Sequence, residues 1–243
     1  MQPRHLVIFT RYPTAGGGKR RLAAGIGAVH ALRFQRVRLA ILLQRLSHDP
    51  RWTTWLAITP DGSGPWPLHV NTITQGRGDL GQRLSRVTRA LPRGPAVIIG
   101  CDIPGITSHA IASAFDALGN HDAVFGPAPD GGYWLIGLRR APCVRLPYAN
   151  VRWSSKHALA DTIANLPGAK VARLHTLTDI DTSADLARHS DWARAFPPRE
   201  GGRQETGTIP TLVMNDRSSL SSPGTGEGAP GRCEASLRDD RGG

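Results

Sequence analysis

The chain has 243 residues, of which 40% are hydrophobic and 20% charged, a composition typical of a globular protein with one large α/β domain or two small ones. It has no run of eighteen apolar residues, and its opening segment, MQPRHLVIFTRYP, is too short and too soon interrupted for a signal sequence. We therefore expect a cytoplasmic protein without a membrane partner. The three cysteines lack metal-ligand spacing and imply no disulfide framework; we interpret Cys101 as a small buried thiol.

The net charge of +11 is concentrated in the first part of the chain. Residues 1–100 hold 15 Lys and Arg against 3 Asp, residues 101–196 hold 9 against 9, and residues 197–243 hold 6 Arg against 7 Asp and Glu. This distribution fits a phosphate-binding half, although solvated arginine faces explain many of these charges equally well. No aromatic interleaving accompanies them, so we expect no nucleic-acid partner. Residues 1–196 contain no glutamate, which leaves carboxylate chemistry to aspartates.

In chain order, the apolar run at 5–9 predicts a buried strand, and the glycine-dense basic segment 10–27 predicts a long functional loop that runs into a helix. Apolar residues at helical spacing predict an amphipathic helix over 28–47. Strands are expected at 53–60 and 69–75. A helix over 78–91 would place Leu80, Leu84, Val87 and Leu91 on one face.

The continuous apolar run at 96–102 is typical of a strand inside a parallel sheet. A helix over 107–118, opened by Thr107 or Ser108, should follow, and then two strands at 122–128 and 132–139. The remaining expected elements are a helix near 154–166 capped by Ser154 or Ser155, a strand at 170–175, and a closing helix over 183–196.

This alternation predicts an α/β fold with a mostly parallel, twisted sheet that carries helices on both faces. The two strands around 130–133 suggest one antiparallel element. From residue 197 onward the chain is rich in Pro, Gly, Ser and charge. We therefore expect one domain over 1–196 and a disordered tail over 197–243.

The segment after the first expected strand has the composition of an anion site. Gly16, Gly17 and Gly18 would let backbone N–H groups approach a phosphate, and the positive end of the following helix would face the same ligand. The side chains that would add charge for a diphosphate are Arg11, Lys19, Arg20 and Arg21. The glycine spacing fits neither a P-loop nor a dinucleotide-binding fingerprint, and a merely flexible basic loop stays open as an alternative.

Two aspartate motifs suggest a metal. Asp102 follows the strongest strand, where ligands bind in open parallel sheets, although it could also be a helix cap. In DIDTSADL, Asp179 and Asp181 alternate and could face one cation, whereas helix capping is the alternative. A third motif, GPAPDGGYWLIG, contains a turn signal together with glycines that would leave room for a ligand. No histidine pattern or Ser–His–Asp ordering suggests a hydrolase.

These motifs, VIFTRYPTAGGGKRRLA, GDLGQRL, IIGCDIPGI, GPAPDGGYWLIGL, RWSS and DIDTSADL, occur in the order seen in the bacterial DUF2064 family, which the chain resembles over about residues 5–190. That family is grouped with GT-A-type glycosyltransferases and associated with arsenosugars or radical-SAM enzymes. The chain is also similar, more distantly, to the nucleotidyltransferases that make molybdopterin guanine dinucleotide or guanylylate phospholactate.

The resemblance implies a GT-A (nucleotide-diphospho-sugar transferase) fold, a nucleotide-sugar or NTP substrate, a small-molecule acceptor, and Mg²⁺ or Mn²⁺. It implies that Asp102 and Asp181 bind the metal, and that Asp130, with Gly131 and Gly132, belongs to an acceptor-side or sugar-side loop in which Asp130 is catalytic. The family loop usually reads P-G-x-x-K-T-R-L, and here Ala15 and Arg20 replace the proline and the threonine.

Three functions remain open at this point. The first is a metal-dependent glycosyltransferase with a nucleotide-diphospho-sugar donor. The second is a nucleotidyltransferase that releases pyrophosphate, which the basic Lys19–Arg21 run favours slightly. The third is a non-catalytic nucleotide-binding module.

Overall fold

The computed structural model describes residues 2–14, 16–67 and 69–196. The predicted tail over 197–243 and the substituted Ala15 lie outside these residues. The strands of the described part are β1 (His5–Arg11), β2 (Thr53–Thr59), β3 (Asn71–Thr74), β4 (Ala96–Gly100), β5 (Ala123–Pro127), β6 (Tyr133–Leu138) and β7 (Val171–Arg173). The helices are α1 (Arg20–Ile26), α2 (Ala28–Leu46), α3 (Leu80–Ala90), α4 (Ser108–Ala117), α5 (Ala158–Ala164), α6 (Ser183–Ala187) and α7 (Ser190–Ala195).

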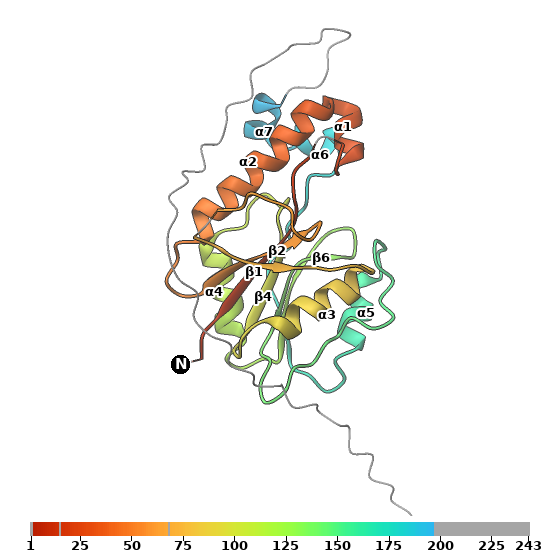
Figure 1. The fold of residues 1–243 in the computed structure, drawn as a ribbon. Helices are drawn as coiled ribbons and strands as arrows, with labels where there is room; N and C mark the ends of the chain where they lie inside the picture. Colours follow the sequence, from red (N-terminus) through yellow and green to blue (C-terminus); the bar gives the residue numbers. More distant parts are fainter. Residues whose placement is uncertain (1, 15, 68, 197–243) are drawn as a thin grey trace, which may run out of the picture.

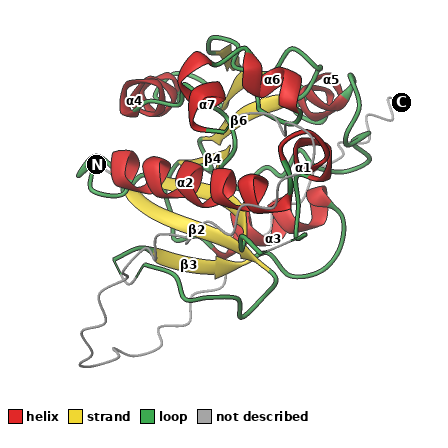
Figure 2. Ribbon diagram, turned by 90° about the horizontal axis from the view of Figure 1, so that it is seen from above, coloured by secondary structure: helices red, strands yellow, loops and turns green. Residues whose placement is uncertain are grey.

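The described strands form one sheet in the order β3-β2-β1-β4-β6-β5-β7. All neighbouring pairs are parallel except those of β6, which runs antiparallel to both β4 and β5. Helices α2 and α4 lie on one side of the strands and α3 and α5 on the other (Figure 2). The predicted mostly parallel α/β sheet, with helices on both faces and one antiparallel element, is therefore confirmed.

Alternation of side chains along the strands supplies two apolar cores. In β1, Leu6 and Ile8 face the core under α2 and α4, whereas Val7 faces the core under α3 and α5. A third, smaller cluster joins α1, the first half of α2, α6 and α7, which lie together at one end of the molecule (Figure 1). It consists of Leu22, Ile26, Ala31, Phe34, Ile180, Leu186 and Phe196. This cluster fixes α1, which follows the predicted phosphate loop, and the residues on both sides of Asp181.

Several local predictions were wrong. The segment 10–27 is not one long loop, because β1 extends to Arg11 and α1 begins at Arg20. The closing helix is interrupted and forms α6 and α7. Helix α5 begins later than expected, after His157, so neither of the proposed serines caps it. Leu80 is 43% exposed, because it lies in the first turn of α3 and misses the buried face.

Candidate functional site

The site lies where β1 and β4 end. These neighbouring strands are parallel, so the segments that follow them emerge at the same edge of the sheet. Lys19 lies in the connection from β1 to α1, and Asp102 lies two residues beyond β4. The chain after β7 returns to this edge, because the amide of Leu177 donates to Pro127 O and that of Ile180 to Asp102 O. Asp181 is thereby carried to the same place.

Lys19 joins the two aspartates that the sequence predicted as metal ligands. Its Nζ lies 2.6 Å from Asp102 Oδ2 and 2.5 Å from Asp181 Oδ1, and it donates to Ile180 O at 2.7 Å. The Lys19 side chain is only 10% exposed. Burial acts to lower its pKa, but the two carboxylates outweigh burial and raise it. The ammonium group is therefore held as a cation between two carboxylates.

Backbone geometry and a helix cap hold this group in place. Lys19 is the N-cap of α1 and has a left-handed backbone with φ of 49°. On the other side, Thr182 and Asp185 form a complete capping box at the start of α6, and the Asp181 amide also donates to Asp185 at 3.2 Å. The helix capping that the sequence analysis left open for this motif is therefore made by Thr182 and Asp185. Arg21 adds a second cation, 3.0 Å from Asp181 Oδ2.

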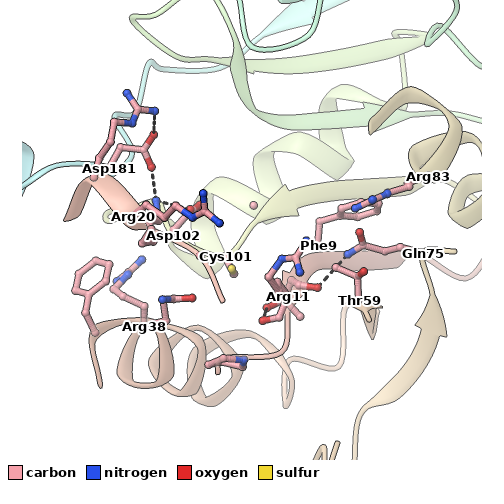
Figure 3. A pocket seen from close by; sticks show the side chains of 18 residues that line it. Phe9, Arg11, Arg20, Arg38, Thr59, Gln75, Arg83, Cys101, Asp102 and Asp181 are labelled. Carbon is pink, nitrogen blue, oxygen red and sulfur yellow. Dashed lines mark hydrogen bonds and ion pairs between the residues drawn. The ribbon is translucent and has the colours of Figure 1, made fainter. Parts of the chain in front are cut away.

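A cleft of about 470 Å³ opens beside this constellation (Figure 3). Asp102, Asp181 and Arg38 lie at one end of it, and Arg11, Gln75 and Arg83 lie at the other. Its lining residues are Phe9, Thr10, Arg11, Pro13, Gly18, Lys19, Arg20, Arg21, Phe34, Gln35, Arg38, Thr59, Gln75, Arg83, Gly100, Cys101, Asp102 and Asp181. Six of these side chains are cationic and two are carboxylates, so the cleft attracts polyanions.

The predicted glycine loop reaches the cleft only in part. Gly18 lines it, next to Lys19, whereas Gly16 and Gly17 do not. Gly16 has a φ of +72°, and a Cβ on Gly17 would come within 2.1 Å of the hydroxyl of Thr14. These two glycines therefore serve the tight turn that precedes α1. Direct phosphate contact by their amides stays a prediction.

The Asp130 turn lies outside the lining of the cleft. Asp130 is exposed, and its Oδ1 accepts from Gly132 N at 2.9 Å. Gly131 has a φ of +84°, and a Cβ there would collide with the backbone of Lys156 at 2.2 Å. Packing accounts for Gly131 without a ligand. The structure does not bring Asp130, Gly131 or Gly132 together with Lys19, so their predicted roles in catalysis and nucleotide binding stay predictions.

Asp179, the partner of Asp181 in the sequence motif, is partly buried. Burial raises its pKa, and the neighbouring charges of Asp181, Asp102 and Asp130 raise it further. Asp179 does not line the cleft.

Cys101 does line the cleft, but burial raises the pKa of its thiol to about 11, so the thiol stays protonated near neutral pH and is not activated as a nucleophile.

Sequence reasoning missed two buried polar residues of the cleft. Gln75 follows β3, and its Nε2 donates to Thr10 O at 3.0 Å and Ala57 O at 2.7 Å, so its amide is fixed across the ends of β1 and β2. Its position directly after a strand could have identified it as a residue of the ligand edge of the sheet. Arg38 lies in the middle of α2 and is 5% exposed. Its place between Phe34 and Leu42, four residues away on either side, was the signal that it belongs to the apolar stripe.

Among the residues that the structure describes, no group of three or more His, Cys, Asp or Glu side chains could hold a metal ion. A metal at this site would therefore rest on Asp102 and Asp181 alone, with other ligands coming from substrate and water.

No helix of the described chain is long and apolar enough to span a membrane.

Comparison with solved structures shows the fold. The chain is similar to a protein from Desulfovibrio desulfuricans G20 that is provisionally described as a nucleotide-diphospho-sugar transferase, with a TM-score of 0.69, 23% identity, and coverage of 81% of this chain and 99% of that chain. It is also similar to 2-C-methyl-D-erythritol 4-phosphate cytidylyltransferase from Thermus thermophilus (TM-score 0.52, 18% identity, 80% and 100% covered). A third is the inositol-1-phosphate CTP transferase from T. maritima (TM-score 0.50, 11% identity, 80% and 96% covered). The predicted nucleotide-diphospho-sugar transferase fold is thus confirmed.

A search of the curated proteins found no match. The family model described as "Uncharacterized protein conserved in bacteria (DUF2064)" matches residues 36–155. This range contains Asp102 and the Asp130 turn, whereas Lys19 and Asp181 lie outside it. The resemblance to DUF2064 that the sequence motifs indicated is therefore confirmed over residues 36–155.

Proposed function

We propose that this chain is a metal-dependent glycosyltransferase that uses a nucleotide-diphospho-sugar donor. The observation that carries the proposal is the joining of Lys19 to Asp102 and Asp181 at the carboxyl edge of the sheet, inside a cationic cleft. The three solved neighbours, which are described as transferases of nucleotide compounds, support a transferase. The fold alone does not specify the reaction, so the argument rests on the site.

The cationic side chains suit a departing nucleoside diphosphate. When a glycosyl bond breaks, negative charge accumulates on the leaving diphosphate, and fixed cations that are already in place stabilise that charge. Lys19 and the neighbouring Arg20 and Arg21 line the cleft, and so does Arg11 at the end of β1. Arginine and lysine side chains bind phosphate oxygens through charge-assisted hydrogen bonds.

The carboxylates suit Mg²⁺ or Mn²⁺ in their donor chemistry. Both Asp102 and Asp181 reach one point, the Lys19 nitrogen, so they converge closely enough to share a cation. Magnesium commonly takes one or two protein carboxylates and completes its shell with substrate phosphates and water. We therefore infer that Asp102 and Asp181 hold the ion, which when bound would neutralise charge on the leaving diphosphate. Lys19 would then move its charge from the carboxylates to the phosphates.

A second candidate is nucleotidyl transfer from an NTP with release of pyrophosphate. The observation that favours it is the excess of cations: Arg11, Arg20, Arg38 and Arg83 line the cleft, and none forms an ion pair with a carboxylate of the described chain. A triphosphate would use more of these charges than a diphosphate ester.

The deciding experiment offers the protein each class of substrate in the presence of Mg²⁺ or Mn²⁺ and acceptor mixtures. Release of a nucleoside diphosphate from a nucleotide-sugar supports glycosyl transfer, and release of pyrophosphate from an NTP supports the second candidate. Asp102→Asn should abolish either product, whereas Asp116→Asn, on the exposed surface of α4, should not. Tight nucleotide binding with neither product, unchanged by Asp102→Asn and by the metal, would show a non-catalytic binding module.

A further inference from the structure

Arg38 is a buried cation in the floor of the cleft. It lies in α2, it is 5% exposed, and it is one of the residues that line the cleft. Figure 3 shows it at the same end of the cleft as Asp102 and Asp181. Arginine is rarely this deeply buried unless it is paired, because removing a charge from water is costly. The partners of this guanidinium group therefore show whether its charge is used within the protein.

The protein satisfies only a small part of the hydrogen-bonding capacity of the Arg38 guanidinium group. A guanidinium group has five N–H donors. Arg38 donates one hydrogen bond from Nη2 to Ile103 O at 2.6 Å, and its Nε has no partner. No carboxylate of the described chain forms an ion pair with it, and Asp102, the neighbouring carboxylate, is already paired with Lys19. Burial lowers the pKa of Arg38, but an arginine retains its charge in proteins.

The same side chain is held in a fixed place. Its guanidinium carbon lies 5.0 Å from the centre of the Trp192 ring, a cation–π distance. Trp192 packs on Phe34 and Phe196 with ring centres 5.3 and 5.9 Å away. The aromatic cluster between α2 and α7 thus supports one face of the group. A planar cation that is fixed before the ligand arrives loses little further conformational entropy when it binds an oxyanion.

We propose that Arg38, on helix α2, binds a phosphoryl group of the substrate in the cleft. The assignment rests on the proposed function in that the cleft takes phosphorylated substrates. The phosphoryl group comes either from the nucleotide or from a phosphorylated acceptor. In both cases Arg38 determines specificity, because a substrate without this group would leave a buried cation without a partner.

Helix α2 supplies a matched control. Arg45, two turns further along, donates from Nη1 to Ile106 O at 2.9 Å, as Arg38 donates to Ile103 O, but Arg45 does not line the cleft. Binding of inorganic phosphate and of a nucleoside diphosphate is measured by calorimetry for the wild type, Arg38→Met, Arg38→Lys and Arg45→Met. We expect Arg38→Met to weaken phosphate binding by about tenfold or more, and Arg45→Met to leave it unchanged.

Arg38→Lys keeps the charge and loses the planar fork, so it should fold even if the methionine variant does not, and it should bind phosphate several-fold more weakly. Competition identifies the source of the group. If saturating nucleoside diphosphate displaces inorganic phosphate, Arg38 takes a nucleotide phosphate; if both bind together, it takes the acceptor's.

Three results would overturn the assignment: wild-type protein that binds no phosphate, Arg38→Lys with wild-type affinity, or Arg45→Met with an equal loss. Failure of the proposed function would look different. In that case no nucleotide-sugar is turned over, yet the dependence of phosphate binding on Arg38 persists.

Discussion

Replacing Lys19 by methionine tests whether its ammonium group holds the two aspartates together. The variant removes three contacts, to Asp102, Asp181 and Ile180 O, and leaves two carboxylates facing each other. A hydrogen bond to a charged group contributes about 1.5–3 kcal/mol, but both carboxylates are about one third exposed, so water compensates much of the loss. We expect the free energy of unfolding to fall by about 2 kcal/mol.

The assay is urea unfolding followed by tryptophan fluorescence, with and without Mn²⁺. In the Lys19→Met variant the ammonium group no longer occupies the point at which the two carboxylates meet, and only the exposed Arg21 stays paired with Asp181. An ion present at about ten times its dissociation constant then restores about 1.4 kcal/mol. In the wild type the ion must first displace the ammonium group, so Mn²⁺ should stabilise the wild type less than the variant. Lys170→Met is the control, because Lys170 is exposed and forms no ion pair within the described chain.

A loss below about 0.5 kcal/mol, the usual range of surface substitutions, would refute the structural role of Lys19. Equal stabilisation of wild type and variant by Mn²⁺ would refute the idea that the ammonium group and the metal compete for Asp102 and Asp181.

Three further substitutions test the surroundings of the site. Gly131→Ala should lower the free energy of unfolding by more than about 2 kcal/mol, because it adds a left-handed alanine against the Lys156 backbone; wild-type urea stability would contradict this packing. Gln75→Leu should cost about 1–3 kcal/mol, since two strand carbonyls lose their donor, and a neutral result would mean that water replaces it. The Lys170 amide and Arg139 lower the pKa of Asp122. The stabilising effect of the Asp122 carboxylate on the fold should therefore be present above pH ~4 and disappear as the pH falls through the lower pKa that Asp122 has in the folded state. Thermal unfolding of Asp122→Asn should therefore differ from that of the wild type at about pH 7 and converge with it in acid; a constant difference would contradict the shift.

The parts of the site that follow from strand ends were predictable from the sequence. The apolar run before Asp102 marks a buried parallel strand, and such strands place their following residues at the ligand edge. The Thr182 cap was also readable, because side-chain caps are local. What the sequence could not supply was the pairing of Lys19 with Asp181 across 162 positions, which depends on how the chain after β7 returns along β5.

Glycines were the least reliable guide to the site. The glycines of the Asp130 segment were interpreted as room for a ligand, but a Cβ on Gly126 would meet the Trp134 ring, and one on Gly137 would meet Val124. A glycine required by close packing and one required by a ligand look the same in a sequence. The start of the short helix α1 was missed because the usual sequence signal of a helix start is absent. Helix α1 has no side-chain cap and begins after a left-handed lysine, which no helix-start rule predicts.

The sequence motifs separated a phosphate half, centred on Lys19, from a metal half, centred on Asp102 and Asp181. The structure joins the two halves, because the lysine lies between the carboxylates. Without a ligand, each half therefore neutralises the other, and a buried cation and two carboxylates are stabilised in a cleft that would otherwise hold uncompensated charge. Arg38 is different, since it is buried in the same cleft and pairs with neither carboxylate. Of the buried cations that line the cleft in the described chain, it is thus the one whose charge is left for the substrate to satisfy.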